Sequence, residues 1–410
     1  MKNYDIIIIG AGPAGLFCAI NAAENSNRKI LILEKNSSAG KKFLLSGSGQ
    51  CNITHTGTVN EFTRHYGTGG SFVKPALKGF PPASLISFLE KNNIPVIERE
   101  DGKIFPQSMS ASQVLTMMLN LCRERNVEIK YQTPVMKGVY DNRKFRVSSD
   151  KVEETFTAPL LVITAGGKSC PATGSDGDGY RLARSLGHSI ADPAPALAPL
   201  FIKNFPFAEL SGISFKGRSI SLFREGKKIS ASSGDILFTH KGLSGPGILD
   251  MSRYIRKNDS VKISLTGERI EDLSEDFISR SRTEGKKSIK HFLKSYDIPE
   301  RLITIILELL DINPQKNVSE ISKAERNSLL KSLCRYPFTV ERVGDFNIAM
   351  ATAGGVYRDG ISSRTMESTL IPGLFFAGEV IDIDGDTGGY NLQWAFSSAK
   401  AAADHLLKEG

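Results

Sequence analysis

The stretch YDIIIIGAGPAG, residues 4–15, decides the fold of this chain. Residues 6–9 are four consecutive isoleucines, which is typical of a strand buried on both faces of a parallel sheet. Glycines at positions 10, 12 and 15 follow directly, and residues 16–23 favour a helix. A strand, G-x-G-x-x-G and a helix in this order predict the dinucleotide-binding turn of a Rossmann domain.

Each glycine of this turn has a predicted task. Gly10 permits the tight turn, Gly12 lets the backbone approach a pyrophosphate, and Gly15 lets the helix pack closely on the strand. The free N–H groups at the helix N-terminus favour the phosphate charge. The predicted cofactor contacts in this segment are Gly10, Gly12, Pro13, Ala14 and Gly15.

A second apolar run, residues 29–33, predicts the next strand and ends at Glu34. Glu34 lies 24 residues after Gly10, close to the spacing of about 20 for the acid that accepts hydrogen bonds from an adenosine ribose. Glu34 and the adjacent Lys35 are therefore predicted cofactor contacts.

The segment after this acid, residues 37–54, is rich in glycines, hydroxyls and an amide, with two lysines ahead of them. Such a composition suits a backbone track along phosphates and a polyol chain, and a flexible surface loop is the alternative. Cys51 could face an isoalloxazine ring, although a small buried thiol is the commoner interpretation. The predicted contacts here are Lys42, Ser46, Gly47, Gly49, Cys51 and Asn52.

Two distant segments complete the predicted site. Residues 160–167 form a buried strand with a small-residue turn; this is no P-loop, because the first glycine of that motif would fall on Val162. Residues 373–379 form a strand that ends in an acid, and residues 388–393 open a last helix over 394–407. The remaining predicted contacts are Val135, Thr164, Ala165, Gly166, Gly378, Glu379, Gly389, Tyr390, Asn391 and Leu392.

Composition limits the function classes. The 410 residues carry a net charge of +8, but the basic residues are scattered, so we expect no nucleic-acid surface. Five cysteines without a C-x-x-C pair indicate a reducing cytoplasm and neither a zinc ribbon nor a redox dithiol. We expect no signal peptide and no membrane span. We also expect no metal site, because residues 382–393 lack the glycine and the glutamate of a calcium-binding loop.

Several segments together resemble a family of bacterial FAD-binding oxidoreductases that includes aminoacetone oxidase and the bile-acid reductase BaiN. The matching segments are residues 9–15, 40–54, 102–108, 237–246, 352–356 and 366–393. This resemblance implies an FAD cofactor, with the acid Glu379 on the ribityl chain and the last helix directed at the flavin pyrimidine. Ser48 and Gln50 stand where the family has glycine and a basic residue, which puts a cationic contact at position 50 in doubt.

The resemblance also implies a glutathione-reductase-like α/β fold with an insertion. The predicted FAD-binding domain comprises residues 1–192 and 349–410. Alternating, β-rich stretches predict a small inserted β-barrel over 193–268 and 337–348. Helical patterns, including a capping box at Ser322–Glu325, predict a helical subdomain over 269–336.

With FAD the cofactor carries the redox chemistry, so no catalytic side chain is assigned from sequence. His240 could bind a substrate carbonyl or be an ordinary loop histidine, and Tyr390 and Asn391 are candidates for substrate contact. We predict a monomeric enzyme that reduces an activated double bond or oxidises a small amine, with NAD(P)H as a transient electron donor or O₂ as acceptor. An RNA-modifying flavoprotein and a non-catalytic FAD-binding protein are the alternatives.

Overall fold

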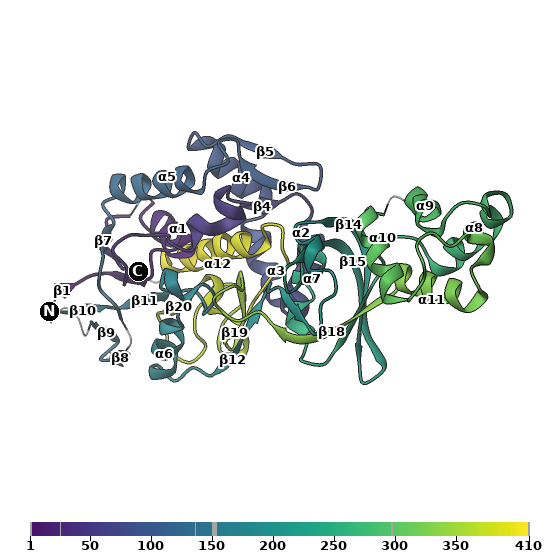
Figure 1. Ribbon diagram of the computed structural model, residues 1–410. Helices are drawn as coiled ribbons and strands as arrows, with labels where there is room; N and C mark the ends of the chain where they lie inside the picture. Colours follow the sequence, from purple (N-terminus) through teal and green to yellow (C-terminus); the bar gives the residue numbers. More distant parts are fainter. Residues whose placement is uncertain (1, 25, 136, 150–153, 297, 409–410) are drawn as a thin grey trace. The chain divides into compact units, whose positions relative to one another are not determined.

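The computed structural model describes residues 2–24, 26–135, 137–149, 154–296 and 298–408 (Figure 1). The chain divides into two units, Met1–Ala196 with Phe346–Gly410, and Leu197–Asp345. The predicted boundary before residue 193 lies inside a strand of the first unit, β12 (Ile190–Ala196), which pairs with β19 (Ala351–Val356). This pairing keeps residues 193–196 in the first unit.

The first unit is built on a parallel sheet in the order β20-β11-β2-β3-β7. The side chains of its three inner strands are buried on both faces, which explains their uninterrupted apolar sequence. The strands are β2 (Ile6–Ile9), β3 (Ile30–Leu33), β7 (Glu128–Lys130), β11 (Leu160–Ile163) and β20 (Leu374–Phe376).

Helices, the β12-β19 pair and two further small sheets complete the described part of this unit. The sheets have the orders β1-β10-β9-β8 and β4-β6-β5. Their strands are β1 (Lys2–Asn3), β4 (Thr54–His55), β5 (Val96–Glu98), β6 (Lys103–Pro106), β8 (Lys137–Asp141), β9 (Lys144–Ser148) and β10 (Thr155–Ala158). The α-helices are α1 (Pro13–Ala22), α2 (Val59–Thr63), α3 (Gly70–Gly79), α4 (Pro82–Lys91), α5 (Ala111–Glu124), α6 (Asp178–Ser185) and α12 (Tyr390–Leu406).

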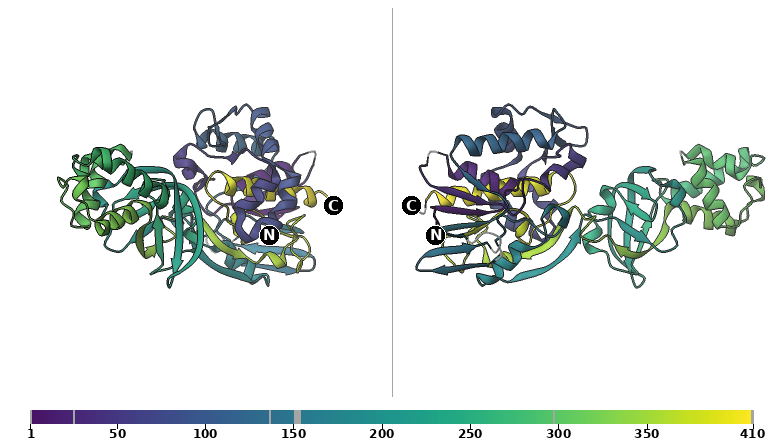
Figure 2. Two further views of the ribbon diagram at one scale, coloured as in Figure 1. Left: turned by 90° about the vertical axis from the view of Figure 1, so that its right-hand side faces the viewer. Right: turned by 60° about the vertical axis from the view of Figure 1, so that its left-hand side comes forward.

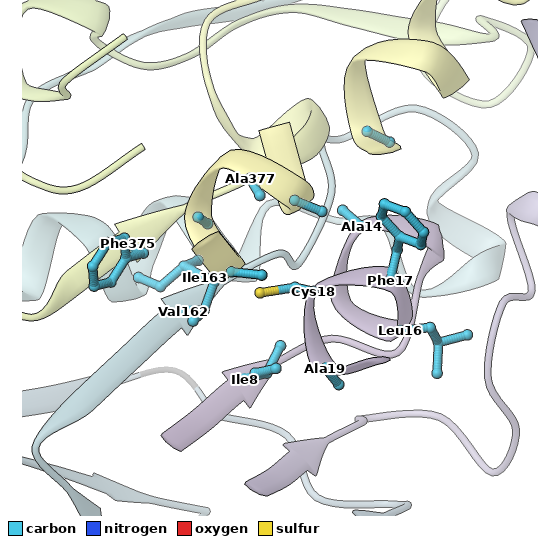
Figure 3. Packing of buried hydrophobic residues seen from close by; sticks show 14 of the residues in the cluster. Ile8, Ala14, Leu16, Phe17, Cys18, Ala19, Val162, Ile163, Phe375 and Ala377 are labelled. Carbon is cyan, nitrogen blue, oxygen red and sulfur yellow. The ribbon is translucent and has the colours of Figure 1, made fainter. Parts of the chain in front are cut away.

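The core of the first unit centres on α1, which packs on the sheet and on α12 (Figure 3). Phe17 of α1 makes edge contacts with Phe88 and Phe396, with ring centroids 5.0 and 5.1 Å apart. Cys18 is fully buried beside β2 and β11, and this burial raises the pKa of its thiol to about 12. The apolar packing fixes α1, and hence the glycine turn that precedes it.

The second unit contains a closed barrel and a group of helices (Figure 2). The barrel order is β13-β16-β15-β14-β17-β18, and a separate apolar core fills the unit. Its strands are β13 (Leu200–Ile202), β14 (Ser214–Arg224), β15 (Lys227–Thr239), β16 (Gly242–Ser244), β17 (Ser260–Ile263) and β18 (Tyr336–Val343). Its α-helices are α7 (Pro246–Leu249), α8 (Ile270–Glu284), α9 (Ile289–Leu293), α10 (Glu300–Leu309) and α11 (Lys323–Cys334).

The predicted fold class is confirmed: a Rossmann domain carries an inserted barrel with helices. The capping box of α11 is also confirmed, because Ser322 accepts a hydrogen bond from the Glu325 N–H and the Glu325 carboxylate accepts one from the Ser322 N–H. Tyr336, which the sequence placed at the end of the helical segment, begins β18 and pairs with Ile263 of β17.

Candidate active site

The predicted site residues that follow the strands lie at one edge of the parallel sheet. Gly10 follows β2, Glu34 follows β3, Thr164 follows β11, and residues 377–379 follow β20. Because these strands are parallel and in register, their carboxyl ends meet at this edge. In open α/β sheets, ligands bind outside the carboxyl ends of the strands, so this edge is the candidate site.

The glycine turn leaves no room for side chains at two positions and leaves space at the third. Gly10 has φ +104°, and a Cβ there would lie 2.8 Å from the Thr164 carbonyl oxygen. A Cβ on Gly15 would lie 2.0 Å from the Gly10 carbonyl oxygen. A Cβ on Gly12 would meet no further atom of the described residues within 4 Å. The space beside Gly12, at the N-terminus of α1, is where a pyrophosphate fits.

Thr164 and Glu34 hold this turn from the two neighbouring strands. The Thr164 hydroxyl donates to the Ile9 carbonyl at 2.9 Å. The buried Glu34 carboxylate accepts hydrogen bonds from the N–H groups of Ala11 and Asn36, each at 2.8 Å. Oε1 also accepts from the Asn36 side-chain amide at 2.8 Å, whereas Oε2 accepts only from Ala11 among the described residues, so Oε2 keeps a lone pair that can accept from a ribose hydroxyl.

Lys42 and Glu379 form an ion pair at the centre of this edge. The Lys42 ammonium donates to both carboxylate oxygens of Glu379, at 2.8 and 2.6 Å. Glu379 also accepts from the Thr352 N–H at 2.9 Å and from the Ser169 hydroxyl at 3.1 Å. Sequence reasoning named Lys42 and Glu379 but missed Ser169 and Thr352, although Thr352 opens one of the family segments. Each of these two residues is a polar residue within a run of small residues, and this pattern was the signal that could have indicated them.

Lys35 forms ion pairs with two carboxylates at the start of α6. Its ammonium pairs with Asp176 at 2.7 Å and Asp178 at 2.6 Å. This pairing holds the start of α6 against the end of β3. Val135 is buried, whereas Ala165 is partly exposed at the turn after β11.

The loop around η1 (Phe43–Gly49) turns sharply through several residues with positive φ. Gly47, Ser48, Gly49 and Cys51 have φ of +54°, +57°, +87° and +64°. A left-handed conformation costs an L-residue free energy that glycine does not lose, which explains why glycine is usual at position 48. Cys51 is fully buried, and burial raises the pKa of its thiol to about 12. The thiol is therefore not activated as a nucleophile.

Position 50 lies close to a cation even though its own side chain is neutral. The Gln50 side-chain carbonyl accepts a hydrogen bond from Arg99 at 2.8 Å. The Arg99 guanidinium lies over the Phe105 ring, 3.9 Å from its centroid. A positive charge thus reaches this loop from the segment between β5 and β6.

The loop that follows η1 meets the start of α12. With its amide oriented to satisfy both neighbours, Asn52 donates to the Thr54 carbonyl at 3.0 Å and accepts from the Gly389 N–H at 3.3 Å. Gly389 has φ +96°, and a Cβ there would lie 2.6 Å from the Thr54 carbonyl oxygen. Asn391 directs its side chain to the Gly385 backbone, with hydrogen bonds of 2.8 Å to both the N–H and the carbonyl. Leu392 is partly buried in the same turn.

Two observations indicate that the described residues at this edge fit an FAD. The first is the open space at Gly12. The second is the buried Ser175 hydroxyl, which has no hydrogen-bond partner among the described residues. A Cβ on Gly166 would lie 3.3 Å from this hydroxyl and 4.0 Å from Glu379, so the orphan oxygen faces the same turn. A dinucleotide with a polyol chain supplies both the phosphate charge and the missing hydrogen bonds.

His240 belongs to the second unit, where it lies exposed in the turn between β15 and β16. Among the described residues, no helix combines the length and the hydropathy needed to cross a membrane.

Comparison with known proteins places nearly the whole chain in one family of Rossmann-domain proteins. A family profile described as "HI0933-like protein Rossmann domain" matches residues 4–405. A ribosomal RNA dihydrouridine synthase of Escherichia coli is 32% identical over 99% of both chains. Its counterpart in Haemophilus influenzae is 31% identical over the full length of both. A 3-dehydro-bile acid delta(4,6)-reductase of Clostridium scindens is 30% identical over 96% of this chain and 97% of its own.

Solved structures share the fold at low sequence identity. A 3-ketosteroid Δ1-dehydrogenase from Sterolibacterium denitrificans has a TM-score of 0.55 at 13% identity and covers all of both chains. A 3-ketosteroid-Δ4-(5α)-dehydrogenase from Rhodococcus jostii has a TM-score of 0.52 at 14% identity, covering 98% of this chain and 97% of its own. At such identities the likeness concerns the fold.

Proposed function

This chain belongs to the HI0933-like Rossmann family and is an FAD-dependent oxidoreductase, and we propose that it reduces a carbon–carbon double bond conjugated to a carbonyl group. The resemblance stated from sequence is confirmed by the family match and by the bile-acid reductase. The finer statement, which bond is reduced and with which electron donor, is our proposal.

The observation that carries this proposal is a bond type common to the named relatives. Making dihydrouridine saturates the C5–C6 bond of uracil, which is conjugated to the C4 carbonyl. A Δ4,6-reductase acting on a 3-oxo steroid saturates double bonds conjugated to the C3 carbonyl. The two substrates differ in size, charge and polarity, and these relatives align with this chain over nearly its whole length. The reacting group is what they have in common, so they favour reduction over amine oxidation here.

The residues described above fit the parts of FAD one by one. Gly10, Gly12, Pro13, Ala14 and Gly15 would hold the pyrophosphate, because the turn leaves open space at the N-terminus of α1. Glu34 would accept from the adenosine ribose. Glu379 and Lys42 would bind the ribityl hydroxyls, and Ser175 would gain a partner there. When bound, FAD supplies hydride transfer at this edge.

The chain itself would contribute electrostatics at the start of α12. This helix runs for 17 residues and begins at Tyr390, directly after two glycines with positive φ. Its first N–H groups carry the positive end of the helix dipole, which stabilises a negative charge placed before them. In our proposal this end of α12 would face the flavin ring and would stabilise the negative charge that develops there on reduction.

The test is an anaerobic titration of the yellow holoprotein with NADPH and then NADH. We expect one of them to bleach the flavin absorbance, and 4-androstene-3,17-dione or 2-cyclohexenone to restore it. Bleaching of the flavin by a small primary amine, with peroxide formed under air and no response to either nucleotide, would instead support an amine oxidase. A protein that takes up no FAD would contradict the assignment of this edge.

A second candidate substrate is uracil within RNA, and a specific observation favours it besides the two relatives' names. Residues 197–345 carry 25 Lys and Arg against 19 Asp and Glu, so six of the eight net positive charges lie in the second unit. Lys227, Lys228, Arg256 and Lys257 are exposed there. This concentration modifies the expectation, drawn from the scattered sequence pattern, that nucleic acid is not a partner. A polyphosphate backbone favours such a surface.

Incubation of the reduced holoprotein with a uridine-containing RNA separates the two candidates. Conversion of uridine to its dihydro form by mass spectrometry, together with RNA binding that weakens steeply with salt, would support the RNA substrate. Reduction of free enones without either effect would support a small molecule. We place both reactions in the cytoplasm, because all five cysteines are free.

A further inference from the structure

Two histidines stack on Tyr390 at the start of α12. The His65 ring centroid lies 4.0 Å from that of Tyr390, and the His55 centroid lies 5.4 Å away, both with an interplanar angle of 15°. Phe62 and Tyr66 contact the same phenol ring edge-on. Tyr390 is buried, whereas the His65 side chain is 38% exposed. The cluster therefore joins a fixed aromatic base to an imidazole that solvent and ligands can reach.

Of the two stacked histidines, His65 has a carboxylate partner. Its Nδ1 lies 3.0 Å from Oδ2 of Asp386, and its backbone carbonyl accepts from the Asp386 N–H at 2.9 Å. Because a carboxylate only accepts, Nδ1 must carry the hydrogen in this contact. Within the described part of the chain, Nε2 of His65 has no hydrogen-bond partner. By contrast, Nδ1 of His55 lies 2.7 Å from the Thr56 carbonyl.

The backbone that carries the partner carboxylate is itself fixed by neighbouring groups. Asn391 holds the backbone of the 385–386 turn, with bonds to Gly385 and a longer one of 3.4 Å to the Asp386 carbonyl. Tyr66 donates to the Tyr390 carbonyl at 2.8 Å and so ties η2 (Arg64–Gly69), which carries His65, to α12. The His65 ring is thus oriented by a carboxylate, a stacked phenol and two backbone contacts. Such support is typical of a histidine that transfers a proton.

We propose that His65 is the general acid of the reaction and that Asp386 is its positioning residue. This inference rests on the proposed function, because reduction of a conjugated double bond needs one proton for each hydride. The place of His65 in the site follows from Gly389, which precedes Tyr390 and whose N–H donates a hydrogen bond to Asn52 of the cofactor loop. The imidazole therefore borders the end of the site where the flavin ring is placed.

The reduction adds one hydride and one proton across the conjugated double bond. The carbon β to the substrate carbonyl gains the hydride that the reduced flavin of the proposed function would supply and forms one new C–H bond, so the substrate is reduced and the flavin would be reoxidised. The π-electron pair moves toward the carbonyl as an enolate, and the α carbon then takes the proton from Nε2 of the His65 imidazolium. The imidazole is left neutral with its hydrogen on Nδ1, facing Asp386. Its partial exposure lets Nε2 regain a proton from water.

The first test reads the histidine directly and needs no turnover. In the full-length holoprotein labelled with ¹⁵N-histidine, the neutral form of His65 should be the Nδ1–H tautomer, which is the minor form of free histidine. Asp386→Asn should abolish this preference. A neutral His65 with its hydrogen on Nε2 would overturn the proposed pair, whatever the enzyme's substrate is.

The second test separates the two half-reactions by stopped flow. His65→Gln should slow reoxidation of the reduced flavin by 2-cyclohexenone about 10²- to 10⁴-fold, the usual contribution of a general acid, while reduction by the nicotinamide serves as the internal control. His55→Gln is the matched control, because it loses a ring stacked on the same phenol but no carboxylate pair. Added imidazole should partly restore His65→Ala.

The outcomes distinguish this inference from the proposed function. If the wild-type flavin is not reoxidised by any enone or by uridine-containing RNA, the proposed function fails, and the tautomer measurement still decides on the pair. If wild-type protein turns over and both histidine variants slow reoxidation equally, the stack is merely structural and the inference fails alone. Equal rates in wild type and His65→Gln would also overturn it.

Discussion

The two ends of the candidate site are built by different means. At the β2–α1 turn the protein presents backbone, and a Cβ added at two of its three glycines would clash with other backbone atoms. At the start of α12 it presents side chains, with His65 and Asp386 separated by 321 residues in sequence. In the proposed function the first end would hold a constant chemical group, a pyrophosphate, and the second would meet whatever substrate the enzyme reduces. A backbone site is sensitive to added atoms, and a side-chain site to removed ones.

The largest expected effect of an added atom is at Gly15. Gly15→Ala would place a methyl group 2.0 Å from the Gly10 carbonyl oxygen, which is backbone and cannot rotate away. We expect a loss of about 3 kcal/mol in the free energy of unfolding, at the upper end for overpacking, and a colourless protein. Urea denaturation and flavin absorbance measure the two effects.

Gly12→Ala is the matched control, because its methyl group would enter open space in the protein. We expect the apoprotein to unfold at the same urea concentration as wild type, whereas FAD affinity should fall at least about tenfold, or ~1.4 kcal/mol. Equal FAD affinity in Gly12→Ala and wild type would mean that the pyrophosphate does not approach this turn.

A smaller effect on FAD affinity is expected at the Lys42–Glu379 ion pair. Glu379→Gln keeps the shape but removes the charge that pairs with the Lys42 ammonium at 2.6 Å. Both groups are about a quarter exposed or less, so solvent offsets part of the loss. We expect FAD to bind about tenfold more weakly, as measured by equilibrium dialysis. Unchanged binding would place the ribityl chain elsewhere.

The same contrast explains what the sequence could and could not reveal. Gly10, Gly12 and Gly15 were predictable because a turn between a strand and a helix is a local backbone requirement. Lys42 and Glu379 were named as separate contacts, but their pairing depends on how β20 and the loop after β3 meet at the sheet edge. His65 and Asp386 were not named as site residues, because no local pattern links residues that tertiary packing alone brings together. Tyr390 was named without its stacked partners.

A still smaller effect, of opposite sign, is expected at Ser48. Its φ of +57° is unfavourable for an L-residue, so Ser48→Gly should relieve that strain and raise the free energy of unfolding by about 0.5 kcal/mol, after the entropy that glycine adds to the unfolded chain. Gly49→Ala, with φ +87° in the same loop, is the reverse substitution and should destabilise the protein. Thermal unfolding of both variants tests the pair; destabilisation by Ser48→Gly would mean that the serine hydroxyl, not the backbone, matters there.

The smallest expected signal is the lack of reaction at Cys51, whose residue type suggests redox chemistry. Burial raises the pKa of its thiol to about 12, so at neutral or mildly alkaline pH nearly all of it is protonated, and only the thiolate attacks iodoacetamide. Cys170 is partly exposed and should be alkylated first in the native holoprotein. Peptide mapping after timed alkylation gives the two rates. Faster labelling of Cys51 than of Cys170 would show that the η1 loop opens or that the thiol is activated.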